Sequence, residues 1–357
     1  MHRDSLNNVH IQSERVLITP VELKERVPVS AEALSFIADA RQTIANIIQR
    51  RDHRLLVICG PCSIHDMDAA KDYALRLKEL HDRYADSLYI VMRVYFEKPR
   101  TTVGWKGFIN DPNLDGTFDI ELGLQKAREL LAWLAELRLP LATEALDPIS
   151  PQYLADLFSW SAIGARTTES QTHREMASGL SMPVGFKNGT DGNLDTAINA
   201  LKSAAASHAF MGINQQGQVA LLQTQGNPDG HVILRGGKHP NYDSVNVALA
   251  EQAMGKAKLA PRLVVDCSHG NSSKNHELQP LVASNVIHQI QDGNSSILGI
   301  MLESNIGAGS QSSEQPKSQM AYGVSITDAC IDWDTTATLL AKCHDELAEP
   351  LKARLPA

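Results

Sequence analysis

The stretch LLVICGPCSIHD, residues 55–66, opens with an unbroken apolar run and turns polar after Gly60 and Pro61. A run this short, bounded by glycine and proline, is typical of a strand buried on both faces. Eight further runs of the same kind follow, at residues 89–93, 139–143, 162–166, 183–187, 209–213, 232–235, 263–266 and 297–302. The chain is therefore predicted to build its core around a sheet.

Amphipathic helical patterns lie between these runs. The clearest covers residues 120–137, where leucines and alanines recur on one stripe, and another includes Tyr73 and Leu77. Repeated strand–helix–strand units pair in parallel with their helices outside, so we expect an α/β fold, a single (β/α)8 barrel. Nine runs exceed the eight strands of such a barrel by one. Residues 209–225, with Gly217 in the middle, are expected to form an inserted β-hairpin.

The chain has 357 residues, which is enough for one barrel of about 250 residues with additions. Residues 1–29 are largely polar and are expected to form an arm rather than a core element, and a helical pattern starts after Ser30. We expect residues 1–50, arm and helix together, to make oligomer or regulatory contacts. Residues 51–357 are then expected to form the catalytic barrel with its hairpin insertion.

Composition excludes several classes of protein. Hydrophobic residues make up 43% of the chain and charged residues 21%, as in ordinary globular proteins. A net charge of −8 argues against a general nucleic-acid binder, which needs surplus lysine and arginine. No apolar run is long enough for a membrane span, and the first residues lack the apolar centre of a signal peptide. With five cysteines, an odd number, we expect reduced thiols and a cytoplasmic protein that binds neither nucleic acid nor membrane.

Side chains that can do chemistry follow nearly every predicted strand. The carboxyl ends of the strands share one rim of such a barrel, so these side chains are expected to converge there. They are Cys62, Arg93, Glu144, Arg166, Lys187, Arg235, Asp266, His269 and Glu303. A charged residue at one strand end can simply mark where the strand leaves the core. Several cations at one mouth repel one another unless an anion is present, so the set predicts a substrate with phosphate or carboxylate groups.

Two further features concern this rim. Lys98 and Arg100 lie in the loop after the second predicted strand, where they can bind a second phosphate or remain solvated. Cys62, His269 and Glu303 offer a thiolate, an imidazole and a carboxylate, a mixed set suited to a borderline divalent metal. A lone histidine at a strand end is more often only hydrogen-bonded, so the metal prediction depends on all three meeting.

The C-x-x-C pair formed by Cys59 and Cys62 invites a redox interpretation. A dithiol of the thioredoxin type needs its first cysteine exposed at a helix start, whereas Cys59 continues the apolar strand. A zinc ribbon needs a second C-x-x-C pair, and the chain has none. We therefore predict that Cys59 is a packed strand residue and that Cys62 is a metal ligand.

Six longer motifs carry a resemblance to a known family. They are GPCSIHD (60–66), RVYFEKPRT (93–101), GARTTE (164–169), GFKNG (185–189), LRGG (234–237) and DCSH (266–269). In sequence and order they resemble the type I 3-deoxy-D-arabino-heptulosonate 7-phosphate (DAHP) synthases, and the resemblance covers almost the whole chain. It implies a metal-dependent transferase on a (β/α)8 barrel. That enzyme condenses phosphoenolpyruvate with erythrose 4-phosphate and releases phosphate, in the first step of the shikimate pathway.

The resemblance also implies roles for particular positions. Those that match the phosphoenolpyruvate site are Arg93, Lys98, Glu144, Ala165, Arg166, Lys187 and Arg235, and those that match the second phosphate site are Arg100 and Thr101. The positions matching the metal ligands are Cys62, His269, Glu303 and Asp328. Catalytic roles are implied for Lys98, Glu144 and His269. Manganese, iron, cobalt and zinc are all compatible with these ligands.

Members of the family are commonly inhibited by an aromatic amino acid, and the chain looks most like the tyrosine-sensitive form. Positions matching the effector pocket are Asn8, Pro151, Gln152, Leu180, Phe210, Gly212 and Leu222. Gly212 stands where phenylalanine-sensitive relatives carry serine, and the missing side chain makes room for a phenolic hydroxyl. The family's homo-oligomers imply a homodimer or homotetramer here, with the arm and the 209–225 insertion at the subunit contacts.

Two other functions compete with this one. Lys187 follows a strand and can form a Schiff base, which would make the protein a metal-free aldolase. A catalytically silent barrel that senses an aromatic amino acid is the other candidate. Such a barrel is expected to have lost ligands at its rim, whereas here the full set is present.

Overall fold

The structure is a computed structural model that describes residues 6–354. Parallel strands close into a barrel in the order β1-β10-β9-β8-β5-β4-β3-β2. Their bounds are β1 Leu55–Gly60, β2 Leu88–Arg93, β3 Leu141–Glu144, β4 Trp160–Ile163, β5 Val184–Lys187, β8 Gly230–Leu234, β9 Leu263–Asp266 and β10 Ile297–Glu303. The predicted (β/α)8 barrel is confirmed.

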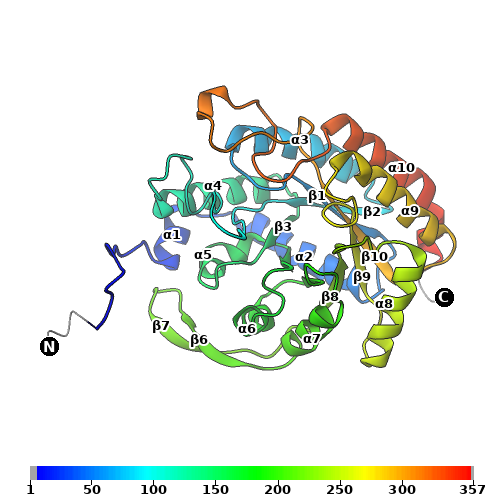
Figure 1. Cartoon of the computed structure of the whole chain (residues 1–357), viewed down its shortest axis with the longest axis horizontal. Coiled ribbons are helices and arrows are strands. Elements are labelled where there is room, and N and C mark those ends of the chain that lie inside the picture. Colours follow the sequence, from blue (N-terminus) through cyan, green and yellow to red (C-terminus); the bar gives the residue numbers. More distant parts are fainter. Residues whose placement is uncertain (1–5, 355–357) are drawn as a thin grey trace.

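The ninth apolar run belongs to a hairpin outside the barrel, as expected. Strands β6 (Ala209–Ile213) and β7 (Val219–Gln223) pair antiparallel in a sheet of their own. In Figure 1 this hairpin runs along the lower left of the molecule, outside the barrel. Its turn is tied back to the body, because the Gln215 carbonyl accepts from the Val21 amide at 2.9 Å and the Gln215 side chain donates to Gln152 at 2.6 Å.

Helices surround the barrel (Figure 1). Their bounds are α1 Pro20–Arg26, α2 Ala31–Ile48, α3 Met67–Arg83, α4 Ile120–Glu136, α5 Ser150–Leu154, α6 Gln171–Gly179, α7 Asp195–Ala204, α8 Ser244–Lys256, α9 Gln279–Gln291 and α10 Trp333–Lys352, with short 3-10 turns η2 Ala155–Leu157, η3 His276–Leu278 and η4 Lys317–Gln319. Local sequence explains where several begin. Asp66, for example, accepts from the amides of Asp68 and Ala69 and so caps α3.

Helix α2 closes the amino end of the barrel. Its apolar face, including Ile44 and Ile47, forms one buried cluster with the inward residues Leu56 and Trp160 and their neighbours. The alternate residues of the same strands, such as Val57, pack outward against the helices in a second cluster. With the amino end sealed by apolar packing, polar side chains of the interior gather at the carboxyl end.

Residues 1–29 were expected to form an arm rather than a core element, and the structure differs from this expectation at residues 20–26. Residues 1–5 of the predicted arm lie outside the described residues. Residues 20–26 form α1, which begins with a capping box between Thr19 and Glu22. Leu23 is fully buried, so this part of the arm belongs to the core. Ile18, Pro20 and Leu23 are the buried residues here, and composition averaged over the polar segment does not reveal them.

A strand boundary also shifts at one functional position. The run 162–166 was expected to carry Arg166 at its end, but β4 ends at Ile163 and Arg166 lies in the turn that follows. The Thr168 hydroxyl accounts for this turn, since it donates to the Gly164 carbonyl at 2.8 Å. Within residues 6–354, no helix is both long and apolar enough to cross a membrane.

Candidate active site and metal centre

A cavity of about 350 Å³ opens at the carboxyl ends of the strands. It brings together most of the predicted site residues, namely Lys98, Arg100, Thr101, Glu144, Ala165, Arg166, Lys187, Arg235, His269, Glu303 and Asp328. Cys62 and Arg93 do not line it and are buried at its base, with exposed fractions of 0% and 1%. Residues far apart in the chain therefore meet at one rim.

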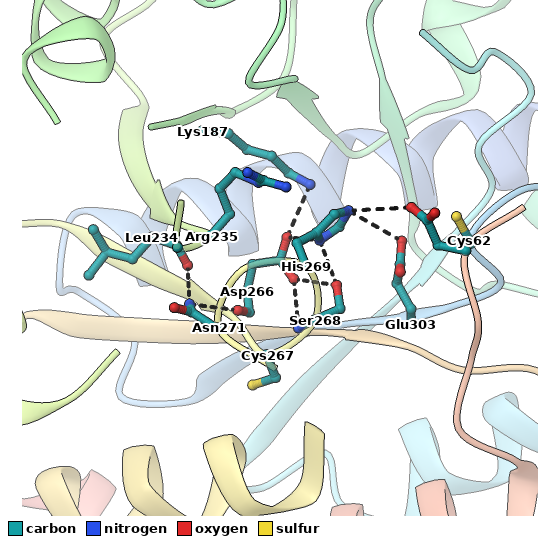
Figure 2. A network of polar contacts seen from close by, with 12 residues as sticks. Cys62, Lys187, Leu234, Arg235, Asp266, Cys267, Ser268, His269, Asn271 and Glu303 are labelled. Carbon is teal, nitrogen blue, oxygen red and sulfur yellow. Dashed lines mark hydrogen bonds and ion pairs between the residues drawn. The ribbon is translucent and has the colours of Figure 1, made fainter. Parts of the chain in front are cut away.

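Three of the predicted metal ligands form a cluster. One donor atom each from Cys62, Glu303 and Asp328 lies within 4.8 Å of the other two. The fourth predicted ligand is adjacent, because His269 Nε2 lies 3.7 Å from Glu303 Oε1 and 4.0 Å from Asp328 Oδ2. Figure 2 shows the imidazole turned toward Glu303 and Cys62. A thiol, an imidazole and two carboxylates suit a borderline divalent ion, so the residues present fit a metal.

The chain positions these donors from separate segments. Glu303 ends β10, where its backbone amide donates to Gln279 Oε1 and its carbonyl accepts from Gln279 Nε2, both at 2.9 Å. Ser63, next to Cys62, shares a 2.7 Å hydrogen bond with Thr327, next to Asp328. This bond ties the loop after β1 to the loop after β10, and so sets the two donors on facing segments.

The Cys62 thiol is held in its protonated form without a metal. Burial and the neighbouring Glu303 carboxylate raise its pKa to about 11. Lys98 Nζ lies 3.1 Å from the sulfur and 3.2 Å from the Cys62 carbonyl. Burial alone would lower the pKa of Lys98, but Cys62 and Glu303 raise it. Because a metal binds the thiolate, its binding would release the Cys62 proton beside a charged lysine.

Arg93 lies behind the metal cluster. Its guanidinium donates to Glu303 Oε1 at 3.1 Å and to the Pro61 carbonyl at 3.3 Å, and it stacks over the Tyr95 ring at 4.1 Å. Its Nη1 is buried and has no hydrogen-bond partner among the described residues. A buried, unsatisfied cationic donor is costly and is usually completed by a ligand or water.

The anion side of the cavity carries the remaining cations. Lys187 ends β5 and is 4% exposed, while Arg235 follows β8 and Arg166 follows β4. Arg166 donates to Thr101 Oγ1 at 3.3 Å, which links the wall of the cavity to the loop after β2. Arg100 and Thr101 lie on that exposed loop. Cationic side chains from the wall and from the loop after β2 therefore face one space.

Glu144 stands between the two sides. It ends β3, is 7% exposed, and its Oε1 has no hydrogen-bond partner among the described residues. Gly164 explains how a carboxylate fits here, since a Cβ at that position would lie 2.2 Å from Glu144 Oε1. Glycine at the start of the GARTTE motif is therefore required by a close approach, which the motif alone does not reveal.

The sequence did not assign a role to Asp266, which the structure places at the centre of the site. Its Oδ2 lies 3.1 Å from Lys187 Nζ and 2.9 Å from His269 Nδ1 (Figure 2). Burial opposes its ionisation, but His269 and Lys187 hold the pKa of Asp266 well below its usual range. One feature of the sequence could have indicated this role: Asp266 lies at a predicted strand end, three residues before His269. Ser268, Ser272, Lys274, His276 and Gln279 also line the cavity without having been predicted.

The structure brings six of the seven predicted effector residues to one region. Phe210 pairs with Leu222 across the hairpin, and a Cβ at Gly212 would lie 2.5 Å from Leu222 Cδ1. The Gln215–Gln152 hydrogen bond connects the hairpin turn to α5, where Pro151 also lies. Leu180 caps α6, whose Gly179 faces Thr224 just after β7.

Asn8 is not part of this region. The described chain before α1 begins as a segment that leads away from the barrel in Figure 1. No hydrogen bond or ion pair within residues 6–354 joins Asn8 to the other six positions; its carbonyl accepts only from the Ile11 amide.

Known proteins share these features. The sequence profile described as "DAHP synthetase I family" matches residues 25–341. The chain is 66% identical over 355 residues to the Tyr-sensitive phospho-2-dehydro-3-deoxyheptonate aldolase of Escherichia coli (strain K12), covering 99% of this chain and 100% of that protein. It is 51% identical over 348 residues to the Phe-sensitive enzyme of the same organism, covering 98% of each. The solved phospho-2-dehydro-3-deoxyheptonate aldolase from Francisella tularensis SCHU S4 matches with a TM-score of 0.92 and 46% identity, covering 97% of this chain and 100% of that chain.

Proposed function

The chain belongs to the DAHP synthetase I family, and we propose that it condenses phosphoenolpyruvate with erythrose 4-phosphate and water, giving DAHP and phosphate. This is the first step of the shikimate pathway, which leads to the aromatic amino acids. One observation carries the assignment. A single cavity of about 350 Å³ has several cations on one side and a thiol, imidazole and carboxylate cluster on the other.

The cations provide the binding energy for two phosphorylated substrates. Lys187, Arg166 and Arg235 bind the phosphate and carboxylate of phosphoenolpyruvate, and Arg93 contributes its unpartnered Nη1 from below. Arg100 and Thr101, on the exposed loop, bind the phosphate of erythrose 4-phosphate. Arg93 and Lys187 are buried and so are held in place before substrate binds, which lowers the entropic cost of orienting phosphoenolpyruvate.

Cys62, His269, Glu303 and Asp328 would hold one divalent metal ion. Such an ion supplies a Lewis acid that polarises the aldehyde of erythrose 4-phosphate. The proposal covers the manganese, iron, cobalt and zinc class, since all four accept these donors.

Two side chains are placed to handle protons. Lys98 projects its ammonium to within 3.1 Å of Cys62 and also lines the cavity. Glu144 Oε1 is buried and unpartnered, so it is free to accept or deliver a proton where water adds to the former enol carbon. His269 joins them as the third catalytic side chain proposed from the family.

Phosphate release tests the assignment directly. It is measured from phosphoenolpyruvate with and without erythrose 4-phosphate, before and after chelation, and again after manganese is restored. We expect release only with the aldehyde and the metal together. Release that survives chelation would move the chemistry to Lys187 as a Schiff base. The 3.1 Å ion pair with Asp266 opposes that alternative, because it engages the nitrogen that would attack the substrate carbonyl.

We also propose that tyrosine inhibits the enzyme by binding beside the hairpin, at Pro151, Gln152, Leu180, Phe210, Gly212 and Leu222. The support is the identity to Tyr-sensitive relatives and the grouping of these positions. Asn8, in the segment before α1, is proposed to complete the pocket of a second subunit. Inhibition by phenylalanine at concentrations where tyrosine has no effect would contradict this assignment.

The hairpin also supports self-association into a homodimer or homotetramer. Met211, Val219 and Leu221 expose 83%, 79% and 74% of their surface on this element. Three large apolar side chains on one exposed hairpin are typical of a subunit interface. All five cysteines are free thiols, which agrees with a reducing compartment, and we propose the cytoplasm as the location.

A further inference from the structure

Asp266 divides its two carboxylate oxygens between different tasks. Oδ1 accepts from the Ser268 amide at 3.0 Å and from the Ser268 hydroxyl at 2.7 Å, which shapes the turn after β9. Oδ2 faces Lys187 Nζ at 3.1 Å and His269 Nδ1 at 2.9 Å. The side chain is fully buried, so this second oxygen interacts with Lys187 and His269 in a site of low dielectric.

The backbone that carries this side chain is held by Asn271. Asn271 Nδ2 donates to the Asp266 carbonyl at 2.9 Å and to the Leu234 carbonyl at 3.0 Å, which joins the ends of β9 and β8 (Figure 2). Asn271 Oδ1 in turn accepts from the Asn241 amide at 2.8 Å. These bonds fix the backbone from which the Asp266 side chain extends, and the Ser268 hydroxyl then holds Oδ1.

We propose that Asp266 is a positioning residue that couples the two halves of the site, holding Lys187 for the substrate anion and His269 for the metal through one oxygen. The proposal rests on the function proposed above. Lys187 lies on the anion side of the cavity, and His269 lies on the metal side. Asp266 is the buried anion placed between them.

On the metal side, Asp266 selects the form of the imidazole that binds a cation. His269 Nδ1 lies 2.9 Å from Asp266 Oδ2 and 2.6 Å from the Ser268 hydroxyl, which itself donates to Asp266 Oδ1, so both neighbours favour the tautomer with its proton on Nδ1. The lone pair of Nε2 is then directed to the side where Glu303 lies at 3.7 Å and Asp328 at 4.0 Å. A carboxylate behind a ligating histidine also raises the basicity of that ligand.

On the anion side, the same oxygen responds to substrate. A phosphate bound at Lys187 competes with Asp266 for the ammonium, and the carboxylate charge then acts more fully on His269. Anion binding and metal binding therefore favour each other, and by thermodynamic linkage the effect is equal in both directions. The affinity of the site for a metal ion is therefore highest when an anion is bound at Lys187.

The test is the Asp266→Asn variant, which keeps the shape of the side chain and removes its charge. Chelated protein is titrated with Mn²⁺ by calorimetry, with and without inorganic phosphate, and phosphate is titrated with and without Mn²⁺. We expect Mn²⁺ to bind the variant about 10- to 100-fold more weakly than the wild type. Phosphate is expected to strengthen Mn²⁺ binding in the wild type and to lose this effect in the variant.

Asp243→Asn is the matched control. Asp243 caps α8 by accepting from the amides of Val245 and Asn246, so it undergoes the same chemical change away from the cavity. The control should keep both affinities and their coupling. If Asp266→Asn also keeps them, Asp266 serves only to shape the turn through Oδ1, and the proposal is wrong.

The Asp266→Asn variant leaves the buried Lys187 without a counter-charge, so it can fail to fold. A second comparison covers that case. The double variant Asp266→Asn/Lys187→Met is compared with Lys187→Met alone, so that neither carries a lone buried lysine. The double variant should bind Mn²⁺ about 10- to 100-fold more weakly than Lys187→Met. Equal Mn²⁺ affinities would overturn the proposal. These are binding measurements, so a protein that couples phosphate and Mn²⁺ but never forms DAHP would refute the proposed function alone.

Discussion

Cys59 and Cys62 are three positions apart in the chain, yet the barrel assigns them to different environments. Cys59 lies in β1, belongs to the outward-facing core and has its sulfur 3.2 Å from the Tyr73 hydroxyl. Cys62 lies beyond the strand, where its sulfur meets Glu303 and Asp328. The strand therefore ends between a packed thiol, Cys59, and the thiol that we propose as a metal ligand, Cys62.

Substitution of the two cysteines should have opposite results. Cys62→Ser removes the thiolate ligand, and we expect DAHP formation to fall to background and bound metal to be lost. Cys59→Ser keeps a hydroxyl near Tyr73 and should retain most of the activity. Both are checked by phosphate release and by metal content after gel filtration. Equal loss in both variants would restore a joint dithiol role.

Glu97 is a second residue whose properties depend on burial. It is 9% exposed, and its Oε2 accepts from the Ser150 hydroxyl at 2.8 Å. Burial, together with the Asp147 carboxylate, raises the pKa of Glu97 to about 8. The folded state therefore binds this proton more tightly than the unfolded chain does, and the stability gained is lost as the pH rises from 4.5 to about 8.

Glu97→Gln should flatten this pH dependence, because the amide stays neutral. Over this interval the wild type is expected to lose up to about 1.4 kcal/mol of unfolding free energy per pH unit relative to the variant. Urea unfolding of both proteins at several pH values measures the difference. Parallel stability curves would show that Glu97 ionises normally.

At the scale of elements, the β6–β7 hairpin is the clearest addition to the barrel. It shares no ladder with the barrel strands, and its turn reaches α1 and α5 through Gln215. An element attached in this way can shift without breaking the catalytic sheet. This makes it a suitable place for an effector pocket, at a distance from the metal donors.

Gly212→Ser should weaken inhibition by tyrosine. A Cβ at this position would lie 2.5 Å from Leu222 Cδ1, so the new side chain must displace Leu222 into the proposed pocket. We expect the tyrosine concentration for half inhibition to rise about tenfold or more, with uninhibited activity unchanged. Gln216→Ser, in the exposed turn, is the control. An unchanged tyrosine response in Gly212→Ser would place the effector elsewhere.

Helix α2 is the element that seals the barrel. Ile44 is fully buried in the cluster shared with the strand interiors. Ile44→Ala should lower the unfolding free energy by about 2 to 5 kcal/mol, because the cavity it leaves is enclosed. Leu34→Ala on the same helix, where Leu34 is 44% exposed, should cost far less. Similar losses for both would mean that α2 does not pack into the barrel mouth.

At the scale of the whole molecule, the exposed hairpin side chains predict association. Leu221→Lys places a charge where 74% of the leucine surface is exposed, so it should not disturb the monomer fold. We expect it to shift the protein toward a smaller species in sedimentation velocity. Gln216→Lys adds the same charge at the turn and should leave the assembly intact. If Leu221→Lys assembles like the wild type, the hairpin is not the interface.

Much of the architecture could be predicted before the structure was known. The alternation of apolar runs and amphipathic stretches implies parallel strands with outer helices, and the ninth run stands apart as a hairpin. Helix α1 was not predicted, because its buried residues, Pro20 and Leu23, lie within a largely polar segment. The end of β4 was also misjudged, because the Thr168 side chain turns the chain before Arg166.

The sequence by itself determined the fold class, the family and the identity of the rim residues, because strand periodicity and long ordered motifs are local properties. Only the tertiary structure decided which side chains touch. It placed Arg93 beneath Glu303, tied Ser63 to Thr327, and set Asp266 between Lys187 and His269. The physical reason is that closure of the barrel brings together strand ends that are up to hundreds of residues apart, at distances that no local pattern encodes.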